Sequence, residues 1–248
     1  MCRTTENLSV RDYNLNMPLL RREAMMKKTI KTALSLIIAA SLLLLMASCT
    51  FSEVLQKLFV GSMDDGTADF DMGVIELGTY VSDFSGMKFT LPESWDFYDR
   101  EELLQMSGLD ENGDEDALKK ELLQKTTVYD MFAVDSVTGM NVIVLYENIK
   151  VQGMNPETFD AQAYAAALTG NLEKQTTIQY TKSSEQTVSV GGYEFLELSY
   201  EAYYPDYDFS IGQKYYIRKI DDFIMGIIVT EGDGSFDEMS PLSYFSAK

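Results

Sequence analysis

The stretch TVSVGGYEFLELSY, residues 187–200, shows how the larger part of this chain is built. Two short segments rich in β-branched and aromatic residues flank Gly191-Gly192, a dipeptide typical of tight hairpin turns. In the second segment, 193–200, successive side chains alternate between the two faces that a strand presents. The stretch therefore predicts two antiparallel strands, 187–190 and 193–200, joined by a hairpin turn.

The same kind of pattern continues on both sides of this hairpin. Further strands are expected at 80–81, 87–91, 128–134, 141–146, 177–181, 210–218 and 223–230. Helical spacing of leucine and aromatic residues predicts helices at 99–106, 115–125 and 157–174, and a short one is expected in the tail, 236–248. This order of elements predicts an α+β fold, in which one antiparallel sheet has helices packed on its faces.

Residues 85–97, SGMKFTLPESWDF, combine an apolar strand, a proline that ends it and Trp95 shortly afterwards. This stretch resembles the opening of PsbP-like domains, and the elements that follow keep the order of that family to about residue 229. Small exported lipoproteins of Gram-positive bacteria are similar. The resemblance implies a single antiparallel sheet flanked by helices, and a binding or assembly role rather than catalysis. It transfers no site residue to this chain, and Trp95 is expected in the core.

The stretch MKKTIKTALSLIIAASLLLLMASC, residues 26–49, has the three-part layout of a secretory signal. Lysines 27, 28 and 31 form its basic start, an uncharged apolar run covers 33–46, and the small Ser48 precedes Cys49. The apolar run is short for a membrane-spanning helix, which needs roughly 20 residues. The stretch therefore predicts export across a membrane.

The end of this signal, Leu45-Met46-Ala47-Ser48-Cys49, resembles the lipobox of bacterial lipoproteins. In that family the cysteine is diacylated and the segment before it is removed. The resemblance implies that Cys49 is lipidated and holds the protein on the extracytoplasmic face of the cell membrane. An ordinary cleaved signal and an uncleaved N-terminal anchor remain the alternatives.

These features divide the chain into four segments. Residues 1–24 are polar and lie upstream of a more natural start at Met25 or Met26. Residues 25–48 form the predicted lipoprotein signal peptide. Residues 49–73 are expected to be a lipidated flexible tether, because their second half is rich in Gly and Asp and has no periodicity. Residues 74–248 are expected to form the α+β domain.

Charge and the absence of histidine narrow the functions that this chain can have. Its formal net charge of −19 disfavours nucleic acid and favours basic partners. The sequence contains no histidine, which excludes Ser-His-Asp and Cys-His catalysis and histidine-ligated zinc. The two cysteines, Cys2 and Cys49, leave no disulfide for the mature domain.

Two functions of different classes follow. The first is a non-enzymatic, lipid-anchored binding or assembly protein of unknown ligand, with the membrane and a protein or glycan of the cell surface as partners. The alternative is a carboxylate-dependent hydrolase acting on cell-wall polymers, which would need two carboxylates at catalytic spacing in a deep cleft. No cofactor is expected, apart from weakly bound calcium.

The calcium hypothesis rests on an acidic loop between two predicted helices. Counted from Asp110, oxygen-bearing side chains stand at positions 1, 3, 5, 7 and 12, the spacing of an EF-hand loop: Asp110, Asn112, Asp114, Asp116 and Glu121. Position 6 is usually glycine and is Glu115 here, which disfavours the sharp turn of that loop. The alternative is an acidic turn in which Asp114 or Asp116 caps the second helix.

An aromatic cluster around Pro205 gives a second candidate site. Tyr203, Tyr204 and Tyr207 stand next to aspartates at the tip of a predicted hairpin. Exposed tyrosines beside carboxylates favour a sugar- or peptide-binding platform. The alternative is that about half of these rings pack on the sheet.

Overall fold

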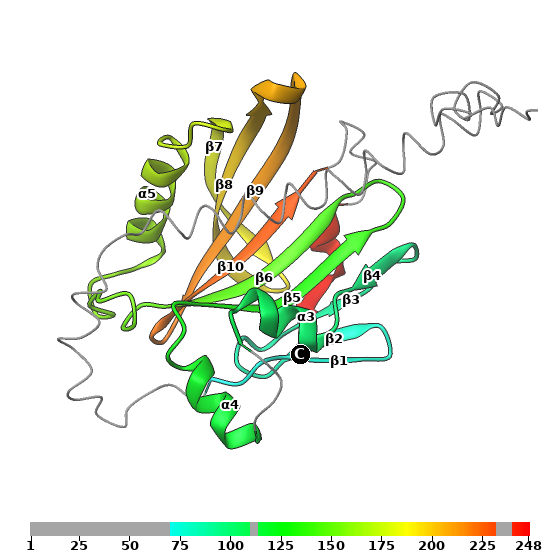
Figure 1. The fold of residues 1–248 in the computed structure, drawn as a ribbon, viewed down its shortest axis with the longest axis vertical. Coiled ribbons are helices and arrows are strands. Elements are labelled where there is room, and N and C mark those ends of the chain that lie inside the picture. The colour runs from blue at the N-terminus through cyan, green and yellow to red at the C-terminus, as the bar shows by residue number, and fades with distance from the viewer. Residues whose placement is uncertain (1–69, 110–113, 232–239) are drawn as a thin grey trace, which may run out of the picture. The chain divides into compact units, whose positions relative to one another are not determined.

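The computed structural model describes residues 70–109, 114–231 and 240–248, all within one compact unit of the chain, Ser48–Lys248. Its largest element is an antiparallel sheet of seven strands in the order β4-β5-β6-β10-β9-β8-β7 (Figure 1). The strands are β4 (Trp95–Phe97), β5 (Thr127–Asp135), β6 (Asn141–Asn148), β7 (Gln179–Val190), β8 (Tyr193–Tyr204), β9 (Phe209–Ile220) and β10 (Phe223–Thr230). The predicted hairpin is formed by β7 and β8, with Val190 paired to Tyr193 across the two glycines.

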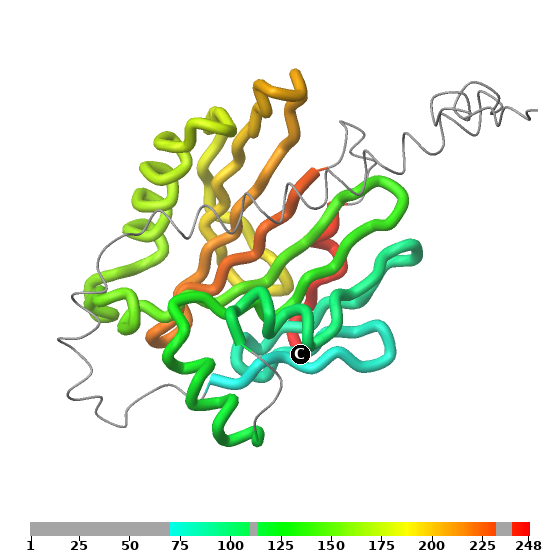
Figure 2. Tube along the Cα trace, viewed as in Figure 1, coloured from blue at the N-terminus to red at the C-terminus, as the bar shows by residue number. Residues whose placement is uncertain are grey.

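A second, smaller antiparallel sheet packs against the first. It contains β1 (Val74–Glu76), β2 (Thr79–Ser82), β3 (Met87–Thr90) and β11 (Phe245–Ala247), in the order β1-β2-β3-β11. The α+β class is therefore confirmed, but the prediction of a single sheet is wrong. The end of the chain, expected to be helical, instead forms a short 3-10 helix, η3 (Pro241–Tyr244), followed by β11. Figure 2 shows this end of the trace, in red, reaching the cyan part of the chain that contains the small sheet. Alternation identifies strands but not their partners, and here β11 pairs with a strand more than 150 residues upstream.

The three α-helices in the described residues each begin after an aspartate. They are α3 (Arg100–Met106), α4 (Glu115–Leu122) and α5 (Ala161–Leu172). The N-cap side chains of Asp99, Asp114 and Asp160 each accept a hydrogen bond from the backbone N–H three residues later. Helix α5 therefore starts at Ala161, four residues after the predicted start, because the chain before Asp160 forms a turn.

The core lies between the two sheets. Tyr80 and Phe89 of the small sheet, and Tyr146 and Met225 of the large sheet, are fully buried there. Phe70 belongs to this core although it lies upstream of the expected domain start at Val74: its ring is 0% exposed. Helix α5 contacts β8 and β9 on the other side of the large sheet, where the hydroxyls of Thr169 and Tyr200 are 2.7 Å apart.

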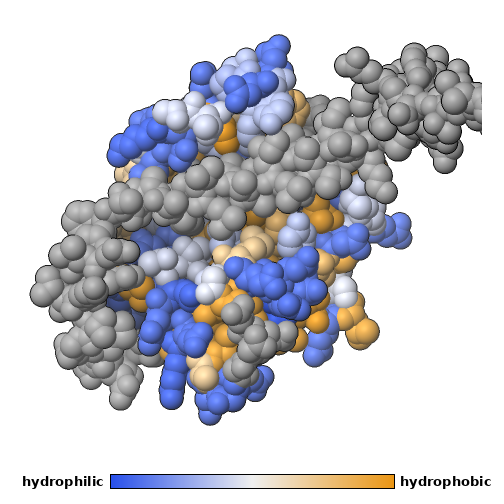
Figure 3. Space-filling view, in the orientation of Figure 1, coloured by the Kyte–Doolittle hydropathy of each residue, from blue (hydrophilic) through white to orange (hydrophobic). Residues whose placement is uncertain are grey.

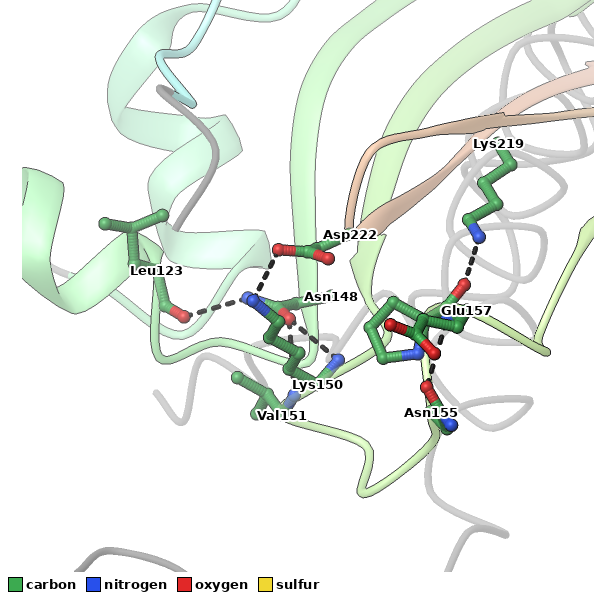
Figure 4. A network of polar contacts seen from close by, with 9 residues as sticks. Leu123, Asn148, Lys150, Val151, Asn155, Glu157, Lys219 and Asp222 are labelled. Carbon is green, nitrogen blue, oxygen red and sulfur yellow. Dashed lines mark hydrogen bonds and ion pairs between the residues drawn. The ribbon is translucent and has the colours of Figure 1, made fainter. Parts of the chain in front are cut away.

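A polar network fixes the loop that leads from β6 to α5 (Figure 4). The Asn148 side chain accepts hydrogen bonds from the backbone N–H groups of Lys150 and Val151, and it donates one to the carbonyl of Leu123. The Lys150 ammonium forms an ion pair of 2.7 Å with Asp222 in the β9–β10 turn. This network therefore ties α4 and the β9–β10 turn to the end of β6.

Candidate functional site

A β-bulge in β5 places a carboxylate in the protein interior. The register of β5 against β6 shifts between Tyr129 and Met131, so that Asp130 is the additional residue. Bulges bend a strand and redirect a side chain, and they are over-represented next to functional sites. Asp130 is 1% exposed, which makes it one of the most deeply buried charged residues described here.

Two donors hold the Asp130 carboxylate. The Tyr80 hydroxyl donates to Oδ2, and the Gly73 backbone N–H donates to Oδ1 at 2.8 Å. No Lys or Arg among the described residues forms an ion pair with it. Burial raises the pKa of Asp130 to about 6, although these two hydrogen bonds and the positive charge of Arg100 favour the ionised form. Asp130 is thus ionised at neutral pH and forms no ion pair with a described residue.

Neutral hydroxyl groups surround this carboxylate. Burial, followed by the negative charge of Asp130, raises the pKa of both Tyr80 and Tyr146 above that of free tyrosine. The Tyr146 hydroxyl lies 3.3 Å from the Ser82 hydroxyl, which accepts a hydrogen bond from the Ser85 N–H. These phenols stay protonated at neutral pH, so they supply hydrogen bonds but no positive charge.

A pocket of about 410 Å³ opens in front of Asp130, and we call it the Asp130 pocket. Its walls are mostly apolar and come from the chain before and within β1, from β4 and from α3: Met72, Gly73, Val74, Ile75, Phe97, Tyr98 and Leu103. Asp99 and Arg100 complete the lining. The arrangement is an apolar pocket with a single buried carboxylate, the kind of site that binds a small group in a fixed orientation.

A larger groove of about 790 Å³, the α4 groove, lies beside this pocket. The two share Met72, Val74 and Arg100. Apolar side chains line the groove from β1, β2 and α4: Val74, Val81, Leu118 and Leu122. Figure 3 shows hydrophobic residues among hydrophilic ones over α3, α4 and β1.

Charged side chains also line the α4 groove, and acidic ones predominate. Two of its aspartates are paired, Asp71 with Lys119 at 2.9 Å and Asp83 with Lys248. Glu76, Glu115 and Asp116 are exposed and form no ion pair with any described residue. The groove therefore combines an apolar lining with three carboxylates that form no ion pair within the part of the chain that the structure describes.

The structure separates the predicted calcium ligands that it describes. Asp114 is the N-cap of α4 and accepts the Ala117 N–H at 2.8 Å, while Asp116 and Glu121 lie within the helix. Five residues along a helix correspond to a rotation of about 140° between those two side chains, measured around the helix axis. This geometry agrees with the alternative, an acidic turn in which Asp114 caps the second helix. Asp110 and Asn112 lie outside the described residues, and calcium binding stays a prediction.

Metal-binding side chains elsewhere in the described residues are also dispersed. Within residues 70–109, 114–231 and 240–248, no three Asp, Glu, His or Cys side chains are grouped as metal ligands. Cys49 is outside these ranges. No described helix has the length and apolar character needed to cross a membrane.

The predicted tyrosine platform has one largely exposed ring. Tyr207 is 66% exposed, whereas Tyr204 is 4% exposed and packs against Phe209. Tyr203 is half-buried, and its hydroxyl donates to Asp208 at 3.0 Å. That hydrogen bond raises the pKa of Tyr203. The inclusion of Tyr204 in an exposed platform is therefore corrected: its ring packs on the sheet, as the alternative had it.

A second buried carboxylate lies under α5. Glu147 in β6 accepts hydrogen bonds from the Tyr164 hydroxyl at 2.8 Å and from the Gln152 side chain at 2.7 Å. Burial raises the pKa of Glu147. Because Tyr164 belongs to α5 and Gln152 to the preceding loop, Glu147 fixes both against the sheet.

Sequence reasoning missed both Asp130 and Glu147. The sequence did carry an indication of each, because each is the lone acid in an otherwise apolar stretch, VYDMFAV (128–134) and VIVLYE (142–147). A charge in such a position is rarely buried without a specific partner.

Comparisons with known proteins show similarity to solved structures only. No protein-family model matches the chain, and no curated protein matches it. The solution structure of cyanobacterial PsbP (CyanoP) from Synechocystis is similar over 76% of this chain and 99% of its own length, with 14% identity and a TM-score of 0.43. A crystal structure from Bacteroides thetaiotaomicron is similar over 69% of this chain and 48% of its own length, with 10% identity and a TM-score of 0.38. The chain thus spans about half of the second structure.

Proposed function

We propose that this chain is a lipid-anchored binding or assembly protein on the extracytoplasmic face of the membrane, and that its α4 groove holds a basic segment of a protein partner. The observation that carries the proposal is the combination of an apolar lining with three carboxylates that form no ion pair within the described residues. A segment with alternating basic and apolar residues would satisfy both features.

The physical basis is complementarity of charge and of apolar surface. Glu76 lines the groove from β1, and Glu115 and Asp116 line it from the first turn of α4. Each exposed ion pair formed with a partner contributes about 0.2–1 kcal/mol, and buried apolar area adds about 25 cal/mol per Å². The net charge of −19 also attracts a basic partner over longer distances and speeds association.

We favour binding over the alternative of a carboxylate-dependent hydrolase. The Asp130 pocket contains two carboxylates, Asp130 and Asp99. Asp99 is engaged as the N-cap of α3, where it accepts the Glu102 N–H, and Asp130 is buried and held by two donors. Hydrolysis would require both groups to meet a substrate and a water molecule.

Charge neutralisation in the groove is expected to reduce partner capture about tenfold. The triple variant Glu76→Gln, Glu115→Gln and Asp116→Asn removes the three carboxylates and keeps the size of each side chain. Three exposed ion pairs together contribute roughly 0.6–3 kcal/mol, and 1.4 kcal/mol, near the middle of this range, corresponds to a factor of ten. The measurement is crosslinking in intact cells followed by quantitative mass spectrometry of the captured proteins.

The matched control is a second triple variant, Glu157→Gln, Glu173→Gln and Glu194→Gln. These residues are also exposed, and their loss changes the net charge by the same amount outside the groove. Capture by the control should equal that by the natural protein. Equal losses in both triple variants would mean that net charge alone attracts the partner, and the groove assignment would fail.

Lipid anchoring is tested separately at Cys49, which lies outside the described residues. Mass spectrometry of the membrane-bound protein should find a diacylated N-terminal Cys49 and no peptide from residues 25–48. Two acyl chains give stable attachment where one does not. In Cys49→Ala, the protein should leave the membrane fraction. An unmodified Cys49 thiol in the natural protein would contradict the anchor.

A further inference from the structure

The Asp130 pocket contains a buried negative charge that no described residue neutralises by an ion pair. The positive charge of Arg100 favours the ionised form of Asp130, but no described residue forms an ion pair with Asp130. Each carboxylate oxygen accepts one hydrogen bond from the protein and retains the capacity for another. A buried charge of this kind gains much from a cation that reaches it, because the surroundings screen weakly.

We propose that the Asp130 pocket binds the side chain of a lysine from the partner segment, with its ammonium group on Asp130 and its methylene groups against the apolar walls. This inference rests on the proposed function, because the pocket and the α4 groove share Met72, Val74 and Arg100. A segment lying in the groove would therefore pass the mouth of the pocket.

The shape and chemistry of the pocket favour lysine. Its walls are formed mainly by Met72, Ile75, Phe97 and Leu103, which suit a flexible four-carbon stem. The ammonium group of lysine is compact and carries three hydrogen-bond donors, whereas the planar guanidinium of arginine would require a wider pocket. The groups that face Asp130 are the neutral phenols of Tyr80 and Tyr146 and the cationic Arg100, with Asp99 also lining the pocket.

Calorimetric titration of the full chain in detergent, with hexylamine as the probe, tests the pocket directly. Hexan-1-ol has the same length and no charge, so it separates the ammonium contact from the apolar contact. We expect hexylamine to bind at pH 7.5 at least tenfold more tightly than hexan-1-ol. Asp130→Asn should abolish this preference, and Glu147→Gln, which alters a buried carboxylate outside the pocket, should keep it.

The pH dependence gives a second readout. Hexylamine stays protonated below pH 9, whereas Asp130, with a pKa of about 6, becomes largely protonated at pH 5. The affinity for hexylamine should therefore fall about tenfold between pH 7.5 and pH 5, and that of Asp130→Asn should not change. Equal binding of hexylamine and hexan-1-ol at pH 7.5 would overturn the proposal.

Cell crosslinking with Asp130→Asn connects the pocket to the partner. Capture reduced about tenfold, together with loss of the hexylamine preference, supports a lysine of the partner. If the preference is lost but capture is unchanged, the pocket takes a free alkylamine, and the assignment to the partner is wrong. A third outcome is that the groove triple variant loses capture, whereas Asp130→Asn keeps it and hexylamine fails to bind. In that case the lysine pocket is wrong, and the proposed function of the groove is retained.

Discussion

Truncation of Phe70 to alanine is expected to lower the free energy of unfolding by about 4 kcal/mol, within the usual range of about 3–5 kcal/mol for a buried phenylalanine. The ring is completely buried between elements from both sheets. It stacks on Phe223 with centroids 4.9 Å apart, and it makes edge contacts with Phe84 at 5.0 Å and Tyr146 at 5.2 Å. Its removal leaves a cavity among rigid rings that have little freedom to fill it.

The measurement is urea unfolding of the full chain, followed by the fluorescence of Trp95, the only tryptophan. Trp95 reports on the core because it packs against it, 6.5 Å from Phe89 between ring centroids. Tyr207→Ala, which removes an exposed ring, is the control and should change the free energy of unfolding by less than about 0.5 kcal/mol. A loss below about 1 kcal/mol for Phe70→Ala would place Phe70 outside the core, as the expected domain start at Val74 assumed.

Phe70 shows why the sequence did not predict this part of the core. It stands in the segment GSMDDGTADFDMG, residues 61–73, whose Gly and Asp content is typical of a solvated linker. One aromatic residue in such a segment has no periodicity from which its burial follows. Two of its partner rings, Tyr146 and Phe223, belong to strands far away in the sequence. Burial here is decided by long-range packing.

The sheets show the same division between local and long-range information. Local alternation predicted the strands that became β5, β6, β8, β9 and β10, and Gly191-Gly192 marked the turn between β7 and β8. The small sheet could not be predicted in this way, because it joins strands that are far apart in the sequence: Phe89 of β3 pairs with Phe245 of β11. A strand of three residues at the end of the chain carries too little alternation to be identified by pattern.

The candidate site was missed for a related reason. Strict alternation over 128–134 assigns every residue to one of two faces, and it does not foresee an additional residue in β5. The lone acid in this apolar stretch was a signal of a special position, but its partners Gly73 and Tyr80 lie in segments that the sequence did not connect to it. The α4 groove likewise depends on how α4 packs beside the small sheet.

Replacement of Asp130 by asparagine is expected to raise the free energy of unfolding by about 3 kcal/mol at pH 7.5. Burial raises the pKa of Asp130 from 3.8 to about 6, and about two pKa units correspond to about 3 kcal/mol. A group whose folded-state pKa is raised contributes stability below its unfolded pKa, and this contribution is lost as the pH rises through the folded pKa. At pH 7.5 the ionised Asp130 therefore destabilises the fold, and the neutral asparagine avoids that cost.

The pH profile distinguishes this effect from a general change in packing. At pH 4 Asp130 is already protonated in the folded state, so the gain from Asp130→Asn should shrink to less than about 1 kcal/mol. Asp135→Asn is a control for which the free energy of unfolding should change in the opposite direction. Desolvation raises the pKa of Asp135, but hydrogen bonds from Thr138, Val137 and Ser94 together outweigh it and lower that pKa. Asp135→Asn should therefore lower the free energy of unfolding at pH 7.5, and this loss should be smaller at pH 4.

A gain from Asp130→Asn that is the same at pH 4 and pH 7.5 would contradict a buried charge without an ion pair.

The destabilising charge of Asp130 also bears on ligand binding. A residue that lowers stability at neutral pH and makes no ion pair within the described residues is costly unless its charge is used. A ligand that binds only the ionised, folded form stabilises the protein, and this stabilisation grows with the logarithm of the ligand concentration once that exceeds the dissociation constant. At pH 7.5 hexylamine should therefore stabilise the natural protein more than hexan-1-ol does, and Asp130→Asn should lose this difference, which links the thermodynamic test to the proposed lysine pocket.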